Sequence, residues 1–283
     1  MSELAFLDWL QRRQRAASAR IVVDRGDDCA VVRIGKQLVL FKVDTVVEGV
    51  HFERGTPWRL VGRKAIARAL SDIAAMGGVA TFAVVALVVR RSMAMRDVQA
   101  ITRGLESMAV PIVGGDTKSH DGPCVVSVTL LGEMRGARPV LRRGARAGDV
   151  LMVTGPLGGS IAGHHLRFTP RLREGRLFAT RLRVHAMIDV SDGLARDLSH
   201  LRVGADLEAE QIPRRGSLRQ ALYDGEDYEL LVAAAPGVAR QIERAGLAIR
   251  IGQVSARAGI RLHHQGGRVE QIVPRGYEHR FGE

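Results

Sequence analysis

The chain has 283 residues, of which 46% are hydrophobic, and this length allows two domains that each bury a core. The formal net charge of +12 comes almost entirely from arginine, because lysine occurs only at positions 36, 42, 64 and 118. This composition excludes a disordered chain. No run of eighteen apolar residues predicts a membrane span, and residues 1–4 lack the pattern of a signal peptide.

Two further features bear on location and partners. Cys29 and Cys124 are isolated, with neither disulfide nor metal-ligand spacing, which favours a reducing cytoplasm. The densest basic stretch, residues 167–183, alternates arginine with leucine and predicts a solvated helix face. Few aromatic residues accompany it, so stacking on nucleic-acid bases is not favoured. We therefore expect neither a membrane nor a nucleic acid as partner.

The first part of the chain, residues 1–137, predicts one domain. Hydrophobic periodicity predicts helices over residues 3–17, 61–76 and 95–108. Apolar runs predict strands over residues 29–34, 37–43, 82–89, 110–113 and 124–133. A loop at residues 114–117 is expected between the last two strands.

A boundary is expected near residue 138, where Arg138-Pro139 and the turn at residues 146–149 interrupt the pattern. The second domain would cover residues 138–283. Its strands are expected near residues 150–154, 186–190, 228–234 and 249–254. Strands that alternate with helices in both domains predict an α/β fold with α+β layers.

Aspartates gather where apolar strands end or turns begin. They are Asp27, Asp28, Asp44, Asp72, Asp116, Asp189 and Asp192. Carboxylates brought into one cleft repel one another unless cations neutralise them, and Mg²⁺ binds through a few carboxylates together with water and substrate phosphates. Together, the acidic loops in a basic chain predict a metal–phosphate site.

Each of these aspartates, taken singly, also has a purely structural alternative. Asp72 could pair with Arg68 one helical turn earlier. Asp189 or Ser191 could cap a helix that begins at Gly193.

Two other segments are weaker candidates. The glycine-rich loop at residues 155–160 could present backbone amides to an anion, but it lacks the lysine of a P-loop and predicts a tight turn. His51 lies just beyond Asp44 and is a candidate substrate contact.

Six short motifs in succession carry a family resemblance. They are Gly26-Asp27-Asp28-Cys29-Ala30, VDTVVEGVHF at residues 43–52, LSDIAAMG at residues 70–77, Gly114-Gly115-Asp116-Thr117, IDVSDGL at residues 188–194 and GEDYEL at residues 225–230. The succession resembles the thiamine-monophosphate kinase family, within the larger group that includes aminoimidazole ribonucleotide synthetase. The resemblance extends over residues 20 to 281.

The resemblance implies a magnesium-dependent enzyme that transfers the γ-phosphoryl group of ATP directly to the phosphate of thiamine monophosphate. It implies several Mg²⁺ ions held by Asp28, Asp44, Asp72, Asp116, Asp189 and Asp192, with Asp44, Asp116 and Asp192 in the catalytic role. It implies ATP contacts from Gly115, Asp116, Ser191 and Arg142, with Arg143 as the alternative to Arg142. The thiamine phosphate would contact His51, Glu226 and Tyr277. The implied fold is that of aminoimidazole ribonucleotide synthetase, with N-terminal domains that pair in a homodimer.

The chain also departs from the family pattern. Lys42-Val43-Asp44 stands where the family usually has Ser-Thr-Asp, and the chain is shorter than usual between residues 163 and 185 and between residues 203 and 222. Either the Lys42 ammonium replaces one cation or one Mg²⁺ is missing. Two other functions therefore stay open: another ATP-dependent member of the group with a different small substrate, and a catalytically silent nucleotide-binding relative.

Overall fold

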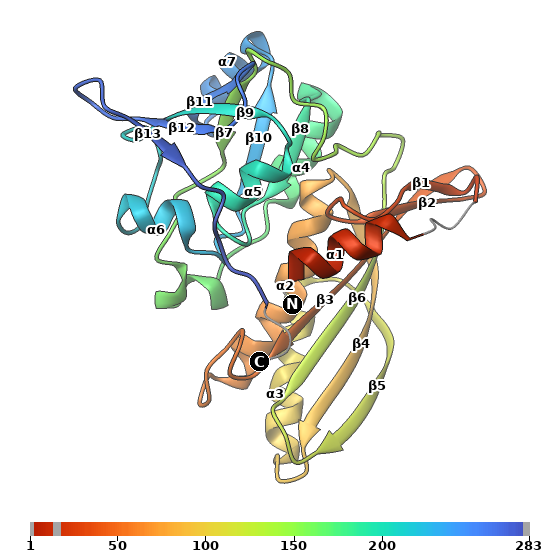
Figure 1. Cartoon of the computed structure of the whole chain (residues 1–283). Helices are drawn as coiled ribbons and strands as arrows, with labels where there is room; N and C mark the ends of the chain where they lie inside the picture. Colours follow the sequence, from red (N-terminus) through yellow and green to blue (C-terminus); the bar gives the residue numbers. More distant parts are fainter. Residues whose placement is uncertain (1–2, 14–17, 280–283) are drawn as a thin grey trace.

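Each half of the chain forms its own β-sheet, as Figure 1 shows for this computed structural model, which describes residues 3–13 and 18–279. The expected mixed α/β fold is therefore confirmed. Residues 14–17 of the first expected helix and the last residues of the family resemblance lie outside the described part. Within the described part, no helix is long and apolar enough to cross a membrane.

The N-terminal sheet has six strands in the order β1-β2-β3-β6-β4-β5, in which β4 and β5 pair in parallel. The strands are β1 (Ile21–Val23), β2 (Ala30–Ile34), β3 (Gln37–Val47), β4 (Val79–Arg90), β5 (Ile112–His120) and β6 (Val125–Glu133). The loop expected at residues 114–117 is wrong, because Gly114 to Thr117 pair with Val84 to Leu87 inside β5. This outer strand is almost entirely exposed and therefore lacks the apolar alternation that marks a strand.

Three helices accompany this sheet: α1 (Glu3–Arg12), α2 (Trp58–Ala75) and α3 (Met95–Leu105), which continues into the short turn η1 (Glu106–Met108). Helices α2 and α3 lie on one side of the strands (Figure 1). A Cβ atom at Gly62 would lie 2.0 Å from the carbonyl oxygen of Ile101, and one at Gly104 would lie 2.1 Å from that of Arg59. These two glycines therefore allow the backbones of α2 and α3 to touch.

Helix α2 also packs against the second half of the chain, and this explains why most of it is buried. Ile66 and Ile73 belong to the N-terminal core. Ala74 and Ala75, which directly follow Ile73, pack in a core cluster that contains Phe178 of the C-terminal half. The alanine-rich sequence of this helix provides the small side chains that permit close packing on two sides.

The C-terminal sheet has seven strands in the order β13-β12-β9-β11-β7-β10-β8. Four lie near their expected positions: β7 (Val150–Val153), β8 (Ala186–Asp189), β10 (Leu230–Ala234) and β11 (Ile249–Ser255). Three more were not expected: β9 (Gly204–Glu208), β12 (Ile260–His263) and β13 (Val269–Ile272). The helical segments are η2 (Ser160–Ala162), η3 (His164–Leu166), α4 (Leu172–Leu177), η4 (Phe178–Leu182), α5 (Leu194–His200), α6 (Leu218–Tyr223) and α7 (Pro236–Arg244).

The arginine-rich stretch at residues 167–183 is only partly a solvated face. Arg173 and Arg181 are exposed, as expected. Arg171 instead donates a hydrogen bond of 2.7 Å to Glu229, and Arg176 donates one of 2.8 Å to the carbonyl oxygen of Met134. These two arginines therefore join α4 to both halves of the molecule.

Residues 134–149 connect β6 to β7 and lead the chain from one sheet to the other. The expected domain boundary between residues 137 and 138 falls in this connection and stays a prediction.

Candidate active site

A cleft of about 1140 Å³ is lined by residues from both halves of the chain. Nine of the predicted site residues line it: Asp44, His51, Asp72, Arg142, Asp189, Ser191, Asp192, Glu226 and Tyr277. Arg142, rather than its neighbour Arg143, is the arginine at the cleft. The fold thus collects side chains as far apart in the sequence as Asp44 and Tyr277, which are separated by 233 residues.

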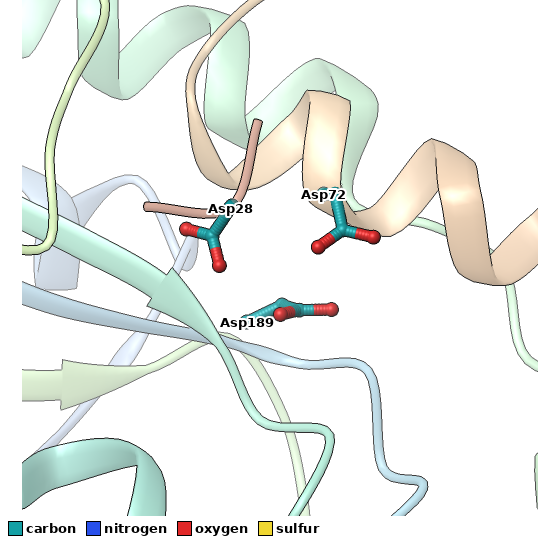
Figure 2. A group of neighbouring side chains, drawn as sticks. All are labelled: Asp28, Asp72 and Asp189. Atoms are coloured by element: carbon teal, nitrogen blue, oxygen red, sulfur yellow. The ribbon is translucent and has the colours of Figure 1, made fainter. Parts of the chain in front are cut away.

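Three aspartates meet at one end of the site and form what we call the acidic cluster: Asp28, Asp72 and Asp189. Each contributes a carboxylate oxygen, and these oxygens lie within 4.8 Å of one another (Figure 2). Asp28 precedes β2, Asp72 lies on α2, and Asp189 is the last residue of β8. The packing of α2 against β8 therefore brings Asp72 and Asp189 together.

The acidic cluster is short of positive charge. Burial, followed by repulsion from Asp28, raises the pKa of Asp189 to about 7, and burial also raises the pKa of Asp72 well above its ordinary value. The Oδ2 atom of Asp28 is buried and has no hydrogen-bond partner among residues 3–13 and 18–279. A buried, unpartnered carboxylate oxygen beside two further carboxylates fits a hard divalent cation such as Mg²⁺.

Among residues 3–13 and 18–279, two cations contact this cluster. Lys42 donates a hydrogen bond of 2.8 Å from Nζ to Asp72, and Arg142 donates one of 2.6 Å from Nη2 to Asp28. Asp189 accepts a hydrogen bond of 2.6 Å from the hydroxyl of Ser71. The three carboxylates thus face two protein cations and one neutral hydroxyl.

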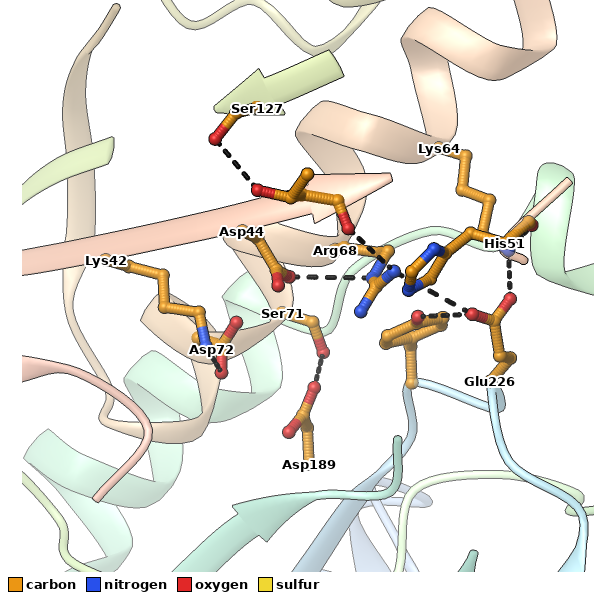
Figure 3. A network of polar contacts seen from close by, with 12 residues as sticks. Lys42, Asp44, His51, Lys64, Arg68, Ser71, Asp72, Ser127, Asp189 and Glu226 are labelled. Atoms are coloured by element: carbon orange, nitrogen blue, oxygen red, sulfur yellow. Dashed lines mark hydrogen bonds and ion pairs between the residues drawn. The ribbon is translucent and has the colours of Figure 1, made fainter. Parts of the chain in front are cut away.

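Asp44 lies beside the cluster on β3 and is paired with Arg68 at 3.5 Å (Figure 3). Arg68 also approaches Glu226 at 3.9 Å. The alternative in which Arg68 pairs with Asp72 is therefore wrong, because Arg68 turns toward Asp44 and Asp72 is bound by Lys42.

The other end of the site holds a second group, the Glu226 network: Glu226, Lys64, His165 and Tyr228. The completely buried ammonium of Lys64 bonds to the Glu226 carboxylate and lies 2.7 Å from Nδ1 of His165. His165 is also 3.1 Å from Glu226, and the hydroxyl of Tyr228 donates to Glu226 at 3.3 Å. Burial opposes the ionised form, but the hydrogen bond from His165 and the charges of Lys64 and Arg68 outweigh it and lower the pKa of Glu226 to about 2.

The sequence interpretation assigned no role in the site to Lys64, Arg68 or His165, although it named Arg68 as a possible partner of Asp72. A signal for the first two exists, because Lys64, Arg68 and Asp72 recur at intervals of four residues and so share one face of α2. No pattern marks His165, which lies in the short segment η3.

His51 is a neutral side chain in this environment. Burial, followed by the charge of Arg68, lowers its pKa to about 4. Its Nδ1 accepts a hydrogen bond of 3.1 Å from the amide of Val47, so Nε2 carries the proton. The ring lies 5.8 Å from that of His279, which in turn contacts Tyr277 edge-on at 5.0 Å. His51 can therefore offer one neutral donor near an aromatic side chain.

The turn that carries Ser191 and Asp192 is held by Asp197. The Oδ2 atom of Asp197 accepts hydrogen bonds from the amides of Ser191, Asp192 and Gly193 at 3.0, 3.0 and 3.1 Å. Gly193 occupies the N-cap position of α5, and no side chain in the described part of the chain caps the helix. The expectation that Asp189 or Ser191 caps this helix is therefore wrong.

The loop at residues 155–160 agrees with a tight turn. Gly158 and Gly159 both have positive φ, and the amide of Gly158 donates to the carboxylate of Asp227 at 2.8 Å. An anion would have to displace this carboxylate.

Gly115 and Asp116 do not line the cleft of the single chain. They lie on β5, where the side chain of Asp116 is 60% exposed and paired with Lys118 at 2.8 Å. Their predicted contacts with ATP and Mg²⁺ stay predictions.

Comparison with known proteins places this site in context. The family described as AIR synthase related protein, N-terminal domain, matches residues 26–134. A thiamine-monophosphate kinase of Rhodopirellula baltica is 36% identical over 310 aligned residues, which cover 98% of this chain and 97% of that protein. One of Bacillus subtilis is 34% identical over 72% of this chain and 75% of its own length. A solved structure, AaThiL complexed with AMPPCP and TMP, superposes with a TM-score of 0.85 at 27% identity, covering 99% of this chain and 97% of that one.

Proposed function

The chain belongs to the thiamine-monophosphate kinase family, and from that premise we propose that it transfers the γ-phosphoryl group of ATP to the phosphate of thiamine monophosphate. The observation that carries this proposal is that the two ends of one cleft differ in chemistry. The acidic cluster, with its unpartnered Asp28 oxygen, is suited to bind cations. The opposite end has the neutral donor of His51 and an aromatic side chain. Phosphate-bound cations and a ring-bearing substrate would meet between them.

Five aspartates would hold the Mg²⁺ ions in this chain: the three of the acidic cluster with Asp44 and Asp192. Bound Mg²⁺ would supply positive charge for the phosphate oxygens and so lower the repulsion between the two phosphate groups. The family resemblance assigns Asp44 and Asp192 the catalytic role, and both line the cleft together with Asp72 and Asp189. The site would also use Asp116 if a partner chain brings it to the cleft.

The reaction requires little covalent help from the protein. A phosphate oxygen of thiamine monophosphate forms the new bond to the γ-phosphorus, the bond from that phosphorus to the β-phosphate oxygen breaks, and ADP leaves. The acceptor is already an anion, so no strong general base is needed. Nε2–H of His51 would hold the acceptor phosphate, and Arg142 and Ser191 would orient ATP.

Tyr277 and Glu226 would position the remainder of the substrate. Tyr277 lines the cleft and is 47% exposed, so its ring is available to a planar ligand. Glu226 is held in its ionised form by the network around it and would face the cationic thiamine group.

We also propose a homodimer that forms through the outer face of the N-terminal sheet. Side chains alternate along a strand, so Phe41 and Val43 of β3 point away from α2, and they are 37% and 61% exposed. Phe82 and Val84 of β4 are 48% and 36% exposed. Asp116 pairs in register with the next outward position of β4, Ala86, so a partner on this apolar face would lie beside Asp116.

A cytoplasmic location is part of the same proposal. It is supported by the two thiols, Cys29 and Cys124, which are both buried and unpaired with each other.

Product analysis tests the function. The purified chain is incubated with ATP, Mg²⁺ and thiamine monophosphate, and thiamine diphosphate is measured with and without a chelator. Metal-dependent formation of thiamine diphosphate is expected. ATP binding without this product would instead favour a different small substrate or a catalytically silent relative.

A further inference from the structure

Lys42 occupies an unusual position for a lysine, because its ammonium group faces the acidic cluster. Lys42 and Asp44 are two residues apart on β3 and therefore point to the same side of the sheet, toward α2 (Figure 3). The Nζ atom bonds to Asp72 at 2.8 Å, and the side chain is only 21% exposed.

The charges around the cluster do not balance. Three carboxylates lie within 4.8 Å of one another, and two protein cations, Lys42 and Arg142, contact two of them. One formal negative charge is left, on a cluster that contains the buried and unpartnered Oδ2 of Asp28. Without Lys42 the cluster would carry two uncompensated negative charges.

An ammonium at this place competes with a divalent ion in two ways. It already uses an oxygen of Asp72 that a metal would need, and its charge repels a second cation at short range. A lysine is tethered, so it does not depend on the free Mg²⁺ concentration.

We propose that Lys42 is a built-in cation that takes the place of one divalent ion, so that the acidic cluster binds one ion fewer than it would with a neutral residue at position 42. This inference rests on the proposed cation site. It makes Lys42 a positioning residue, which acts through Asp72 and the metal rather than on the reacting phosphates.

Titration with Mn²⁺ of the full-length chain without nucleotide, followed by electron paramagnetic resonance, tests the proposal. Lys42→Ser and Lys42→Met remove the charge, Lys42→Arg keeps it, and Lys36→Ser is the matched control in an exposed turn. The first two variants are expected to bind one additional Mn²⁺ per chain, or to bind Mn²⁺ at least about tenfold more tightly. Lys42→Arg and Lys36→Ser are expected to match the unmodified chain.

Equal stoichiometry and affinity in all variants would overturn the proposal, and so would an additional ion in Lys42→Arg. Thermal unfolding provides a second measurement, since removal of Lys42 leaves Asp72 unpaired until a cation binds. Mn²⁺ should raise the unfolding temperature of Lys42→Met more than that of the unmodified chain, and it should restore the fold of any variant that is unfolded in chelator. If Mn²⁺ raises the unfolding temperature of Lys42→Met no more than that of the unmodified chain, the proposal is also overturned.

The Mn²⁺ titration contains neither ATP nor thiamine monophosphate. A chain that makes no thiamine diphosphate, yet gains an ion in Lys42→Ser, would refute the proposed reaction and leave the role of Lys42 intact.

Discussion

The two ends of the cleft solve the problem of buried charge in opposite ways. In the acidic cluster, carboxylates outnumber the cations that touch them, and burial raises the pKa values of Asp72 and Asp189. In the Glu226 network, one carboxylate is surrounded by donors and its pKa falls to about 2. Under the proposed function, bound Mg²⁺ would complete the first end, whereas the protein's own donors already organise the second.

The largest effect on activity is expected from a substitution beside the acidic cluster. Asp44→Asn removes a negative charge beside the acidic cluster and leaves Arg68 without its 3.5 Å partner. We expect thiamine diphosphate formation to fall at least about 100-fold at saturating Mg²⁺, because cation binding next to the phosphates is weakened. Asp121→Asn, at an exposed position, is the control. Near-normal turnover of Asp44→Asn would remove Asp44 from the catalytic set.

A substitution in the Glu226 network should instead lower the stability of the fold. Lys64→Met leaves the Glu226 carboxylate without its buried ammonium partner. The free energy of unfolding, measured with urea, is expected to fall by about 3–5 kcal/mol. Lys36→Met, in an exposed turn, should change it by no more than about 0.5 kcal/mol. A similar small change in both variants would mean that the network does not stabilise the fold.

Low pH should remove the contribution of the same network to the stability of the fold. Glu226 has a pKa of about 2 in the folded chain, below its ordinary value of 4.5, so the folded state binds fewer protons than the unfolded state between these values. Its contribution, on the order of 3 kcal/mol, is complete above about pH 4.5 and is lost as the pH falls toward 2. Glu226→Gln should therefore destabilise the chain clearly at about pH 6 and much less at about pH 3. A pH-independent difference between the two proteins would contradict this.

The smallest effect is expected at Tyr277, the aromatic side chain near His51 at the end of the cleft opposite the acidic cluster. Tyr277→Ala should raise the KM for thiamine monophosphate by about tenfold with little change in kcat, because it removes a contact that substrate and transition state share. Steady-state kinetics with ATP in excess measures this. A fall in kcat at unchanged KM would assign Tyr277 to the chemical step instead.

The sequence predicted those parts of the fold that are marked by apolar side chains. The runs at residues 82–89 and 124–133 are strands because alternate side chains enter the N-terminal core. Only the beginning of the exposed strand β5 was predicted, within the strand expected over residues 110–113, because the rest of its sequence, with Gly114 and Gly115, has no apolar face. Whether a polar segment joins a sheet depends on a free neighbouring edge, which a sequence pattern does not contain.

The candidate site was predictable to a similar extent. Aspartates in a turn and at a strand end pointed to Asp28 and Asp189 of the acidic cluster, since such positions have no hydrophobic reason to carry a carboxylate, whereas Asp72 lies within helix α2. Lys64 and His165 were missed because their partner, Glu226, is 162 and 61 residues away in the sequence. Asp197 was missed for a related reason: its three amide donors are visible only when the turn before α5 is built.

Helix α2 carries residues of both ends of the cleft on one rigid rod. Lys64 and Asp72 are eight residues apart, which corresponds to about 12 Å along the axis, and a helix packed on two sides cannot stretch. The helix therefore fixes the distance between the two ends of the site, and this distance would limit the length of the bound substrate. An analogue whose phosphate is attached through a longer linker would carry that phosphate beyond Nε2–H of His51, which is proposed to hold it. Substrate choice would then depend on the distance between the phosphate and the rest of the substrate as much as on the chemical groups of the substrate.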